Sequence, residues 1–292
     1  MSGEDFLIER LLSQKEPELH KRFSESNFIL QKLLSDYKVL FPEFTDHTET
    51  HSIAVVDYCN HILGEETLNK MNVDELYILL MSCYLHDIGM GITEHDYREF
   101  SAQIDFGDYF ETHEETEPVD VIRAFHNDYS ACFIHKYAQL FDFPSEAHEF
   151  AVMATARGHR KADLFDEKAY PTRVVLENGN TVSLPFLAAT LRLADEVNVA
   201  KDRNLKLVFD PDNWSTEKQH IENAKHEAIR KMTIYHDRIR LDYDTDDPIV
   251  YEAVKKLANK LQKTLDYCVK VADERSEYEL TQKKILLIPM RP

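Results

Sequence analysis

Several histidines and aspartates of this chain lie where an ionisable side chain needs a specific partner. The clearest pair is His86-Asp87, which directly follows the run from Leu76 to Leu85, where only Ser82 is polar. Burying an unpaired carboxylate or imidazolium costs several kcal/mol or more. Neutral imidazole and carboxylate both bind divalent metal ions. The pair therefore fits a metal site, although a helix cap with an ordinary polar contact fits it as well.

The position of this pair distinguishes it from two other copies of the same dipeptide. His95-Asp96 lies in the polar stretch TEHDYRE, and His236-Asp237 lies in YHDRI, between alternating apolar residues typical of two strands and a turn. Neither follows a run that is apolar on every side, which is typical of a helix at the centre of a helical domain. Only the first copy of the dipeptide, His86-Asp87, is therefore a candidate for a functional site.

Four further ionisable residues adjoin apolar helical stripes: His51, His126, His159 and Asp195. Each has an ordinary explanation, such as a hydrogen bond at the edge of the core or a favourable charge at a helix end. Arg192, for example, could form a helix salt bridge with Asp195 or Glu196. Together with His86-Asp87 they form five polar exceptions on five helices, and each needs its own partner. One metal site would satisfy all five.

The elements that must position these residues are mostly helices. Apolar spacing of three and four predicts two helices within 4–40 and further helices over 51–63, 76–91, 119–140, 145–158, 185–198, 216–231 and from Pro248 onward. We expect Gly89 and Gly91 to stop the helix before them. The acidic segment 92–118 predicts a surface loop with short helical turns, or a lid over the site.

A few short strands accompany the helices. Asn178-Gly179 between alternating apolar residues predicts a β-hairpin. Strands are also expected over 205–209, over 232–243 with a turn at the third His-Asp pair, and near the end in KKILLIP. The long helix from Pro248 fits either a core position or the seam of a homodimer.

Composition limits the partners and the compartment. The formal net charge is −19 over 292 residues, which argues against binding long nucleic acid or an acidic membrane. The charge does not exclude nucleotides as ligands, because a bound metal supplies local positive charge.

The cysteines and the N-terminus indicate the compartment. The four cysteines lie in apolar helical patterns without metal-type spacing. The acidic start MSGEDFLIER has no apolar signal core, and no apolar run approaches a membrane span of about 20 residues. We therefore expect a cytoplasmic protein.

In the order of these motifs the chain resembles the HD superfamily of metal-dependent phosphohydrolases. The resemblance covers about residues 40–205 and lies in HTETHS, LHDIG, FHNDYSA, RGH and LRLADEVNVAKDR. The hairpin before LPFLAATLRLADE and the strand-helix tail look like HD domains sometimes attached to a chaperone-like GHKL ATPase. No ATPase segment is evident, so such an ATPase is a candidate partner. Asn198 departs from the pattern, because relatives often have a second acidic residue there.

The resemblance implies a mainly α fold, with an HD-type helical core, a β-hairpin insertion and a small α/β C-terminal extension. We divide the chain accordingly into a helical domain over 1–204, with a ligand core at about 44–200, and an extension over 205–292. By analogy, one divalent ion is held by His51, His86, Asp87 and Asp195. Asp87, the expected catalytic residue, bridges to a second ion held by His126 and His159.

The implied reaction is hydrolysis of a phosphomonoester or phosphodiester in a small nucleotide-like substrate, by hydroxide activated at a dinuclear site. Mn²⁺, Fe²⁺, Ni²⁺, Co²⁺ and Mg²⁺ are all candidates, and a nitrogen-rich ligand set disfavours a site for Mg²⁺ alone. Substrate phosphates could be bound by His47, Arg123, Arg160, Lys161 and Arg203. The alternative is a catalytically silent regulatory module that binds a nucleotide or metal alongside a partner domain.

Overall fold

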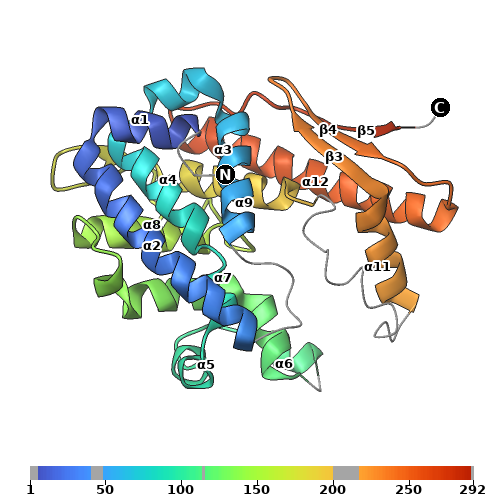
Figure 1. Cartoon of the computed structure of the whole chain (residues 1–292), viewed down its shortest axis with the longest axis horizontal. Helices are drawn as coiled ribbons and strands as arrows, with labels where there is room; N and C mark the ends of the chain where they lie inside the picture. Colours follow the sequence, from blue (N-terminus) through green and yellow to red (C-terminus); the bar gives the residue numbers. More distant parts are fainter. Residues whose placement is uncertain (1–5, 41–48, 114–115, 200–216, 291–292) are drawn as a thin grey trace.

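A helix buried on every side, α4 (Val73–Leu85), lies inside the helical part of the molecule, on the left in Figure 1. The structure, a computed structural model, describes residues 6–40, 49–113, 116–199 and 217–290. Asn72 caps α4, because its side chain accepts hydrogen bonds from the amides of Asp74 and Glu75. Five helices contact α4: α1 (Leu7–Lys15), α2 (Pro17–Leu40), α3 (Glu49–Lys70), α8 (Glu146–Arg157) and α9 (Leu184–Val197). The prediction of a central apolar helix is confirmed.

The predicted end of this helix is wrong in detail. The α-helix ends at Leu85, and a 3-10 turn, η2 (Ile88–Gly91), follows His86 and Asp87. Gly89 does not have the positive φ that favours glycine at a helix end. A Cβ at Gly89 would instead lie 2.4 Å from the backbone nitrogen of Ser130. Glycine is needed there because the turn packs directly on the backbone of a neighbouring helix.

That neighbouring helix is α7 (Pro118–Lys136), which contacts η2 and α8. Its backbone leaves helical geometry at Phe125, one residue before His126. The acidic segment before it contains two short helices, α5 (Glu94–Ser101) and α6 (Tyr109–Thr112). A 3-10 turn, η3 (Ala138–Leu140), follows α7.

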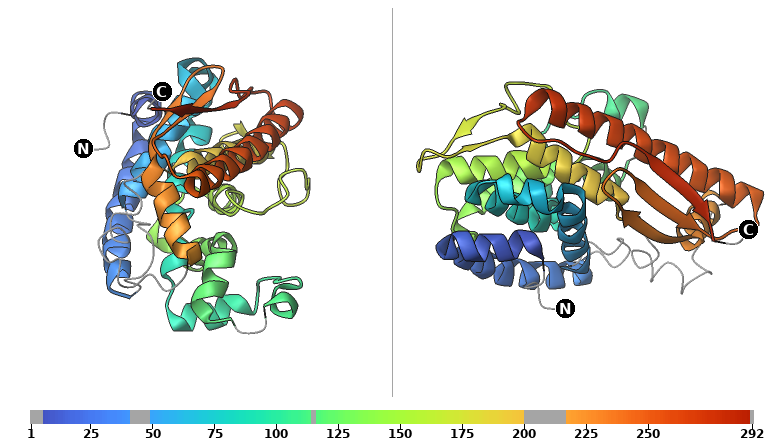
Figure 2. Two further views of the ribbon diagram at one scale, coloured as in Figure 1. Left: turned by 90° about the vertical axis from the view of Figure 1, so that its right-hand side faces the viewer. Right: turned by 90° about the horizontal axis from the view of Figure 1, so that it is seen from above.

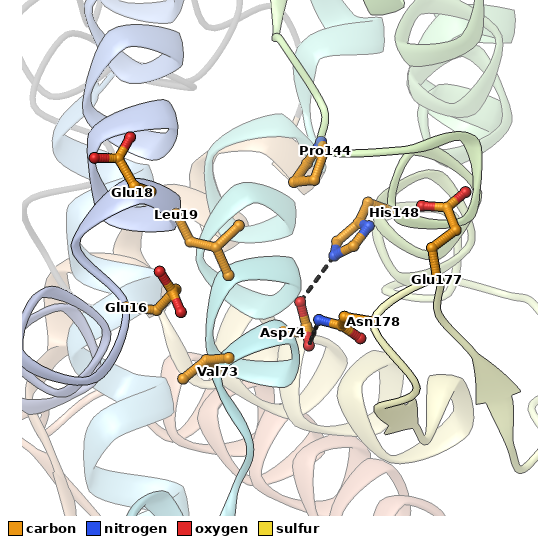
Figure 3. A pocket seen from close by; sticks show the side chains of 9 residues that line it. All are labelled: Glu16, Glu18, Leu19, Val73, Asp74, Pro144, His148, Glu177 and Asn178. Atoms are coloured by element: carbon orange, nitrogen blue, oxygen red, sulfur yellow. Dashed lines mark hydrogen bonds and ion pairs between the residues drawn. The ribbon is translucent and has the colours of Figure 1, made fainter.

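The predicted hairpin is present and is tied to the start of α4. Strands β1 (Val174–Val175) and β2 (Thr181–Val182) pair antiparallel, with Gly179 at φ 86° in the turn. The side-chain amides of Asn178 and Asn180 donate to Asp74 Oδ2 at 2.9 and 2.6 Å. His148 of α8 lies 2.9 Å from Asp74 Oδ1. Buried Asp74 therefore joins three elements beside the hollow of about 320 Å³ drawn in Figure 3.

This network predicts a pH-dependent stability. Burial alone raises the pKa of Asp74, but hydrogen bonds from His148, Asn180 and Asn178 outweigh it and lower the pKa below its usual value. A carboxylate of this kind stabilises the fold above its unfolded pKa of about 3.9, and the contribution is lost as pH falls through the folded pKa. We expect Asp74→Asn to cost about 3 kcal/mol at pH 7, and less as the pH approaches 3.

Urea unfolding of both proteins between pH 7 and pH 3 measures this difference. Asp237→Asn is the control, because the Asp237 side chain is 56% exposed and pairs only locally with Arg238. A gap between Asp74→Asn and wild type that stays constant with pH would contradict the argument.

The C-terminal part combines two helices with a three-stranded sheet. It contains α11 (Glu217–Ala228), β3 (Ile229–Ile234), β4 (Ile239–Tyr243), α12 (Pro248–Arg275) and β5 (Ile285–Pro289). β3 pairs antiparallel with β4 through the predicted turn, and β5 pairs parallel with β4. α12 packs along α9 and also contacts α11 and β5 (Figures 1 and 2). The mainly α fold with small β elements is confirmed.

Two expectations for this part fall outside the described residues. The strand over 205–209 and the boundary between 204 and 205 both lie within 200–216.

In the part of the chain that the structure describes, no single helix has the length and apolar character needed to cross a membrane. The bent pair Val73–Gly91 and Glu94–Ser101 passes that test only when its two helices are taken together.

Candidate metal centre

Five segments place six ionisable side chains at one point inside the helical body. His51 lies in the first turn of α3, His86 and Asp87 follow α4, and His126 lies just after the kink of α7. His159 follows Gly158 at the end of α8, and Asp195 lies near the end of α9. The four histidines are at most 5% exposed. The structure thus brings together all six residues that the sequence analysis named as ligands.

One group of ligand atoms lies on the side of α3 and α4. His51 Nε2 lies 3.1 Å from His86 Nε2, 3.3 Å from Asp87 Oδ2 and 3.3 Å from Asp195 Oδ1. His86 Nε2 lies 3.4 Å from Asp87 Oδ2 and 3.8 Å from Asp195 Oδ1. These four side chains could hold one metal ion.

A second group lies on the side of α7 and α8. His126 Nε2 lies 2.9 Å from His159 Nε2 and 3.3 Å from Asp87 Oδ1. His159 Nε2 lies 3.7 Å from the same oxygen. Asp87 therefore presents Oδ2 to the first group and Oδ1 to the second. The sets His51, His86, Asp87 and Asp87, His126, His159 have the spacing of metal ligands.

The backbone fixes the tautomer of three of the four histidines. The Nδ1 atoms of His86, His126 and His159 lie 2.9, 2.9 and 2.6 Å from the carbonyl oxygens three residues earlier. A carbonyl only accepts, so each Nδ1 carries a proton, and in the neutral ring each Nε2 keeps its lone pair. The lone pairs of His126 and His159 then face each other across 2.9 Å. A cation between them resolves that repulsion, so the donor set fits a metal ion.

Asn198 orients the fourth histidine. Asn198 Nδ2 lies 2.8 Å from His51 Nδ1. Rotation of this amide by 180° exchanges its nitrogen and oxygen, and the rotated amide would accept the Nδ1 proton and leave His51 Nε2 free to bind metal. The residue that departs from the family pattern thus contacts a ligand directly, which its sequence position did not reveal.

The charges of the cluster shift two histidines in opposite directions. Burial lowers the pKa of His86, but the carboxylates of Asp87 and Asp195 outweigh it and raise that pKa to about 10. Burial, together with positive charge on His86 and His126, lowers the pKa of His159 to about 3. The two carboxylates therefore favour a positive charge in the first group, while the lowered pKa of His159 keeps its imidazole neutral at physiological pH.

Arg192 does not form the predicted salt bridge with Asp195 or Glu196. Its guanidinium instead donates to the carbonyl of Gly158 from Nε at 2.9 Å and from Nη2 at 2.7 Å, and to that of Ala162 at 2.7 Å. A Cβ at Gly158 would lie 2.4 Å from Ala188 Cβ. α8 therefore ends in contact with α9, and Arg192 holds the loop that carries His159. The carbonyls of Gly158 and Ala162 lie at and beyond the end of α8, where carbonyls need donors from outside the helix. The Arg192 guanidinium supplies these donors instead of pairing with a carboxylate on its own helix.

Three of the five residues expected to bind substrate phosphate lie in the described part of the chain. Arg123 and Arg160 are exposed, each on the segment that carries a ligand histidine. Lys161 has φ 56°, and its ammonium donates to the carbonyl of Ala124 at 3.0 Å and lies over the Phe125 ring. His47 and Arg203 lie outside the described residues.

A family model described as HD-CE matches residues 41–277. This range contains all six residues of the cluster and most of the C-terminal part. Searches of the curated proteins and of the solved structures returned no match.

Proposed function

This chain belongs to the HD-CE family, and from that premise we propose that it is a metal-dependent phosphohydrolase acting on a small nucleotide-like substrate. The observation that carries the proposal is the position of Asp87, whose two oxygens face two separate sets of histidine Nε2 atoms. A helix cap or a structural salt bridge needs no such arrangement. A pair of divalent ions uses every one of these atoms.

Two ions account for the ligands better than one. His51, His86, Asp87 and Asp195 would hold the first, and Asp87, His126 and His159 the second. The shell contains four imidazoles and two carboxylates, which favours Mn²⁺, Fe²⁺, Co²⁺ or Ni²⁺ over Mg²⁺ alone.

When bound, divalent ions lower the pKa of a water molecule and neutralise charge on phosphoryl oxygens. The protein groups would then position the substrate. The side chain of Asp195 is 17% exposed, while those of the four histidines are nearly inaccessible to solvent. Substrate would therefore approach the cluster from the side of Asp195. Exposed Arg123 and Arg160 could bind its phosphate. The net charge of −19 supports a small substrate rather than long nucleic acid.

Metal removal and replacement tests this proposal. Protein loaded with Mn²⁺ is assayed for phosphate or nucleoside release from nucleotides, cyclic dinucleotides and a generic phosphodiester. We expect turnover of at least one class, its loss after treatment with a chelator, and its return with Mn²⁺ but not Ca²⁺, which prefers oxygen ligands.

The same assay addresses the alternative of a regulatory module. Bound metal with no turnover of any member of the panel would contradict an enzyme that acts alone. It would favour a module that binds a nucleotide and works with a partner domain.

A further inference from the structure

The hydroxyl of Ser130 joins the turn that carries Asp87 to the helix that carries His126. Ser130 Oγ donates to the carbonyl of His86 at 2.6 Å and accepts the N–H of Gly89 at 2.8 Å. These two partners bracket Asp87 in the sequence. Ser130 is fully buried, and it lies one helical turn after His126 on α7. We call this pair of hydrogen bonds the Ser130 bridge.

The bridge uses backbone groups that the end of α4 leaves without a partner in the helix. The carbonyl of His86 lies past the last full turn, where carbonyls need outside donors. One hydroxyl supplies a donor to this carbonyl and an acceptor to the amide of Gly89. Because a hydroxyl has one proton and two lone pairs, both bonds form at once. An alanine at position 130 would leave both backbone groups buried and unsatisfied.

Close packing leaves the bridge little freedom. A Cβ at Gly89 would lie 2.5 Å from the carbonyl oxygen of His126 and 2.8 Å from Ser130 Oγ. The turn and α7 are therefore in backbone contact at this point. A shift of the turn along α7 would change the 3.3 Å separation of Asp87 Oδ1 and His126 Nε2.

The first group shares Asp87 with the second, but none of its other three ligands lies on α7. His51 is on α3, and the imidazole of His86 is oriented by the carbonyl of Cys83 within α4 itself. Only the second group combines a ligand from the turn with a ligand from α7. The two groups should thus respond differently when the bridge is removed.

We propose that Ser130 is a positioning residue that sets the geometry of the metal group Asp87–His126–His159. The proposal rests on the proposed function only in taking this group to bind metal. The bridge acts through the backbone on both sides of Asp87, so its removal should weaken one metal equivalent selectively.

Titration of metal-free protein with Mn²⁺, followed by calorimetry and electron paramagnetic resonance, tests this selectivity. His126→Ala and His51→Ala identify which of the two binding events belongs to which group. We expect Ser130→Ala to weaken the event that His126→Ala removes by about 10- to 100-fold and to leave the other nearly unchanged. The signal of two coupled Mn²⁺ ions should decline in favour of that of a single ion.

Ser82→Ala is the matched control. Ser82 is also a fully buried serine, and its hydroxyl donates to the carbonyl of Val152, away from the turn. We expect it to leave both binding events intact. Equal weakening of both events in Ser130→Ala, or the same selective loss in Ser82→Ala, would overturn the proposal. If Ser130→Ala does not fold, Ser130→Cys, whose thiol is a much weaker donor and acceptor, should give the same selective loss.

Amide hydrogen exchange tests the bridge without metal. Residues 86–92 should exchange faster in Ser130→Ala than in wild type, and at the wild-type rate in Ser82→Ala. Unchanged exchange in this turn would refute the bridge. If wild-type protein binds no Mn²⁺ at all, the proposed function and the effect on metal are both refuted, and exchange alone then decides whether the bridge holds the turn.

Discussion

Asp87→Ala is expected to remove nearly all of the proposed hydrolysis and to release metal from both groups. Asp87 contributes one oxygen to each group, within 3.3–3.7 Å of histidine Nε2 atoms on both sides. No other residue named in the two ligand groups reaches both. Alanine therefore leaves two incomplete ligand sets and removes a negative charge that balances the ions. We expect turnover to fall by at least about a thousandfold, the scale seen when a principal catalytic group is lost.

The measurement combines metal content by elemental analysis with the release assay at saturating Mn²⁺. Asp237→Ala is the matched control, because it alters the same His-Asp dipeptide in an exposed turn far along the chain. It should retain full metal content and turnover. Turnover above a tenth of the wild-type rate in Asp87→Ala would show that the reaction takes place elsewhere.

Arg192→Met is expected to reduce both stability and metal affinity. Methionine keeps much of the apolar stem and removes three hydrogen bonds to the carbonyls of Gly158 and Ala162. Hydrogen bonds from a charged donor contribute about 1.5–3 kcal/mol each when considered singly. The three contributions do not simply add, because one partly accessible side chain makes all three bonds. We therefore expect the free energy of unfolding to fall by about 2–4 kcal/mol in total. The loop carrying His159 should then loosen, weakening the second metal equivalent by about tenfold or more.

Chemical unfolding of metal-free protein measures the first effect, and Mn²⁺ titration measures the second. Arg157→Met is the control, because Arg157 precedes the same loop but pairs with Asp128, with half of its own side chain exposed. An ion pair of this kind contributes about 0–1 kcal/mol. Equal losses in the two variants would show that the contacts of Arg192 have no special role in the site.

Much of the candidate site was predictable because each proposed ligand interrupts an apolar pattern. The run before His86-Asp87 could only be a central helix, and the structure buries it on every side. Helix caps and turns were also predictable, as with Ser145, which caps α8, and Asn178-Gly179 in the turn of the hairpin. These features depend on residues within a few positions of each other, so a single sequence contains them.

The groups that orient the ligands were not predictable in the same way. Ser130, Arg192 and Asn198 all contact atoms on a segment distant in the sequence. Their partners in two of these cases are backbone groups, which every residue has and no side-chain pattern marks. Arg192 illustrates the difficulty, because a neighbouring carboxylate offered a plausible local partner. Gly89 is similar, since its role comes from contact with α7 rather than from its own backbone angles.

The spacing of the six ligands along the chain also has a consequence for folding. They run from His51 to Asp195 on five segments, so the complete set exists only after most of the helical body has formed. Bringing such distant segments together has an entropic cost of loop closure, which slows folding. Each ion that binds only the folded chain would stabilise it by about 2.7 kcal/mol at a hundredfold excess over its dissociation constant. Scarcity of metal would then shorten the lifetime of the protein as well as slow the reaction proposed for it.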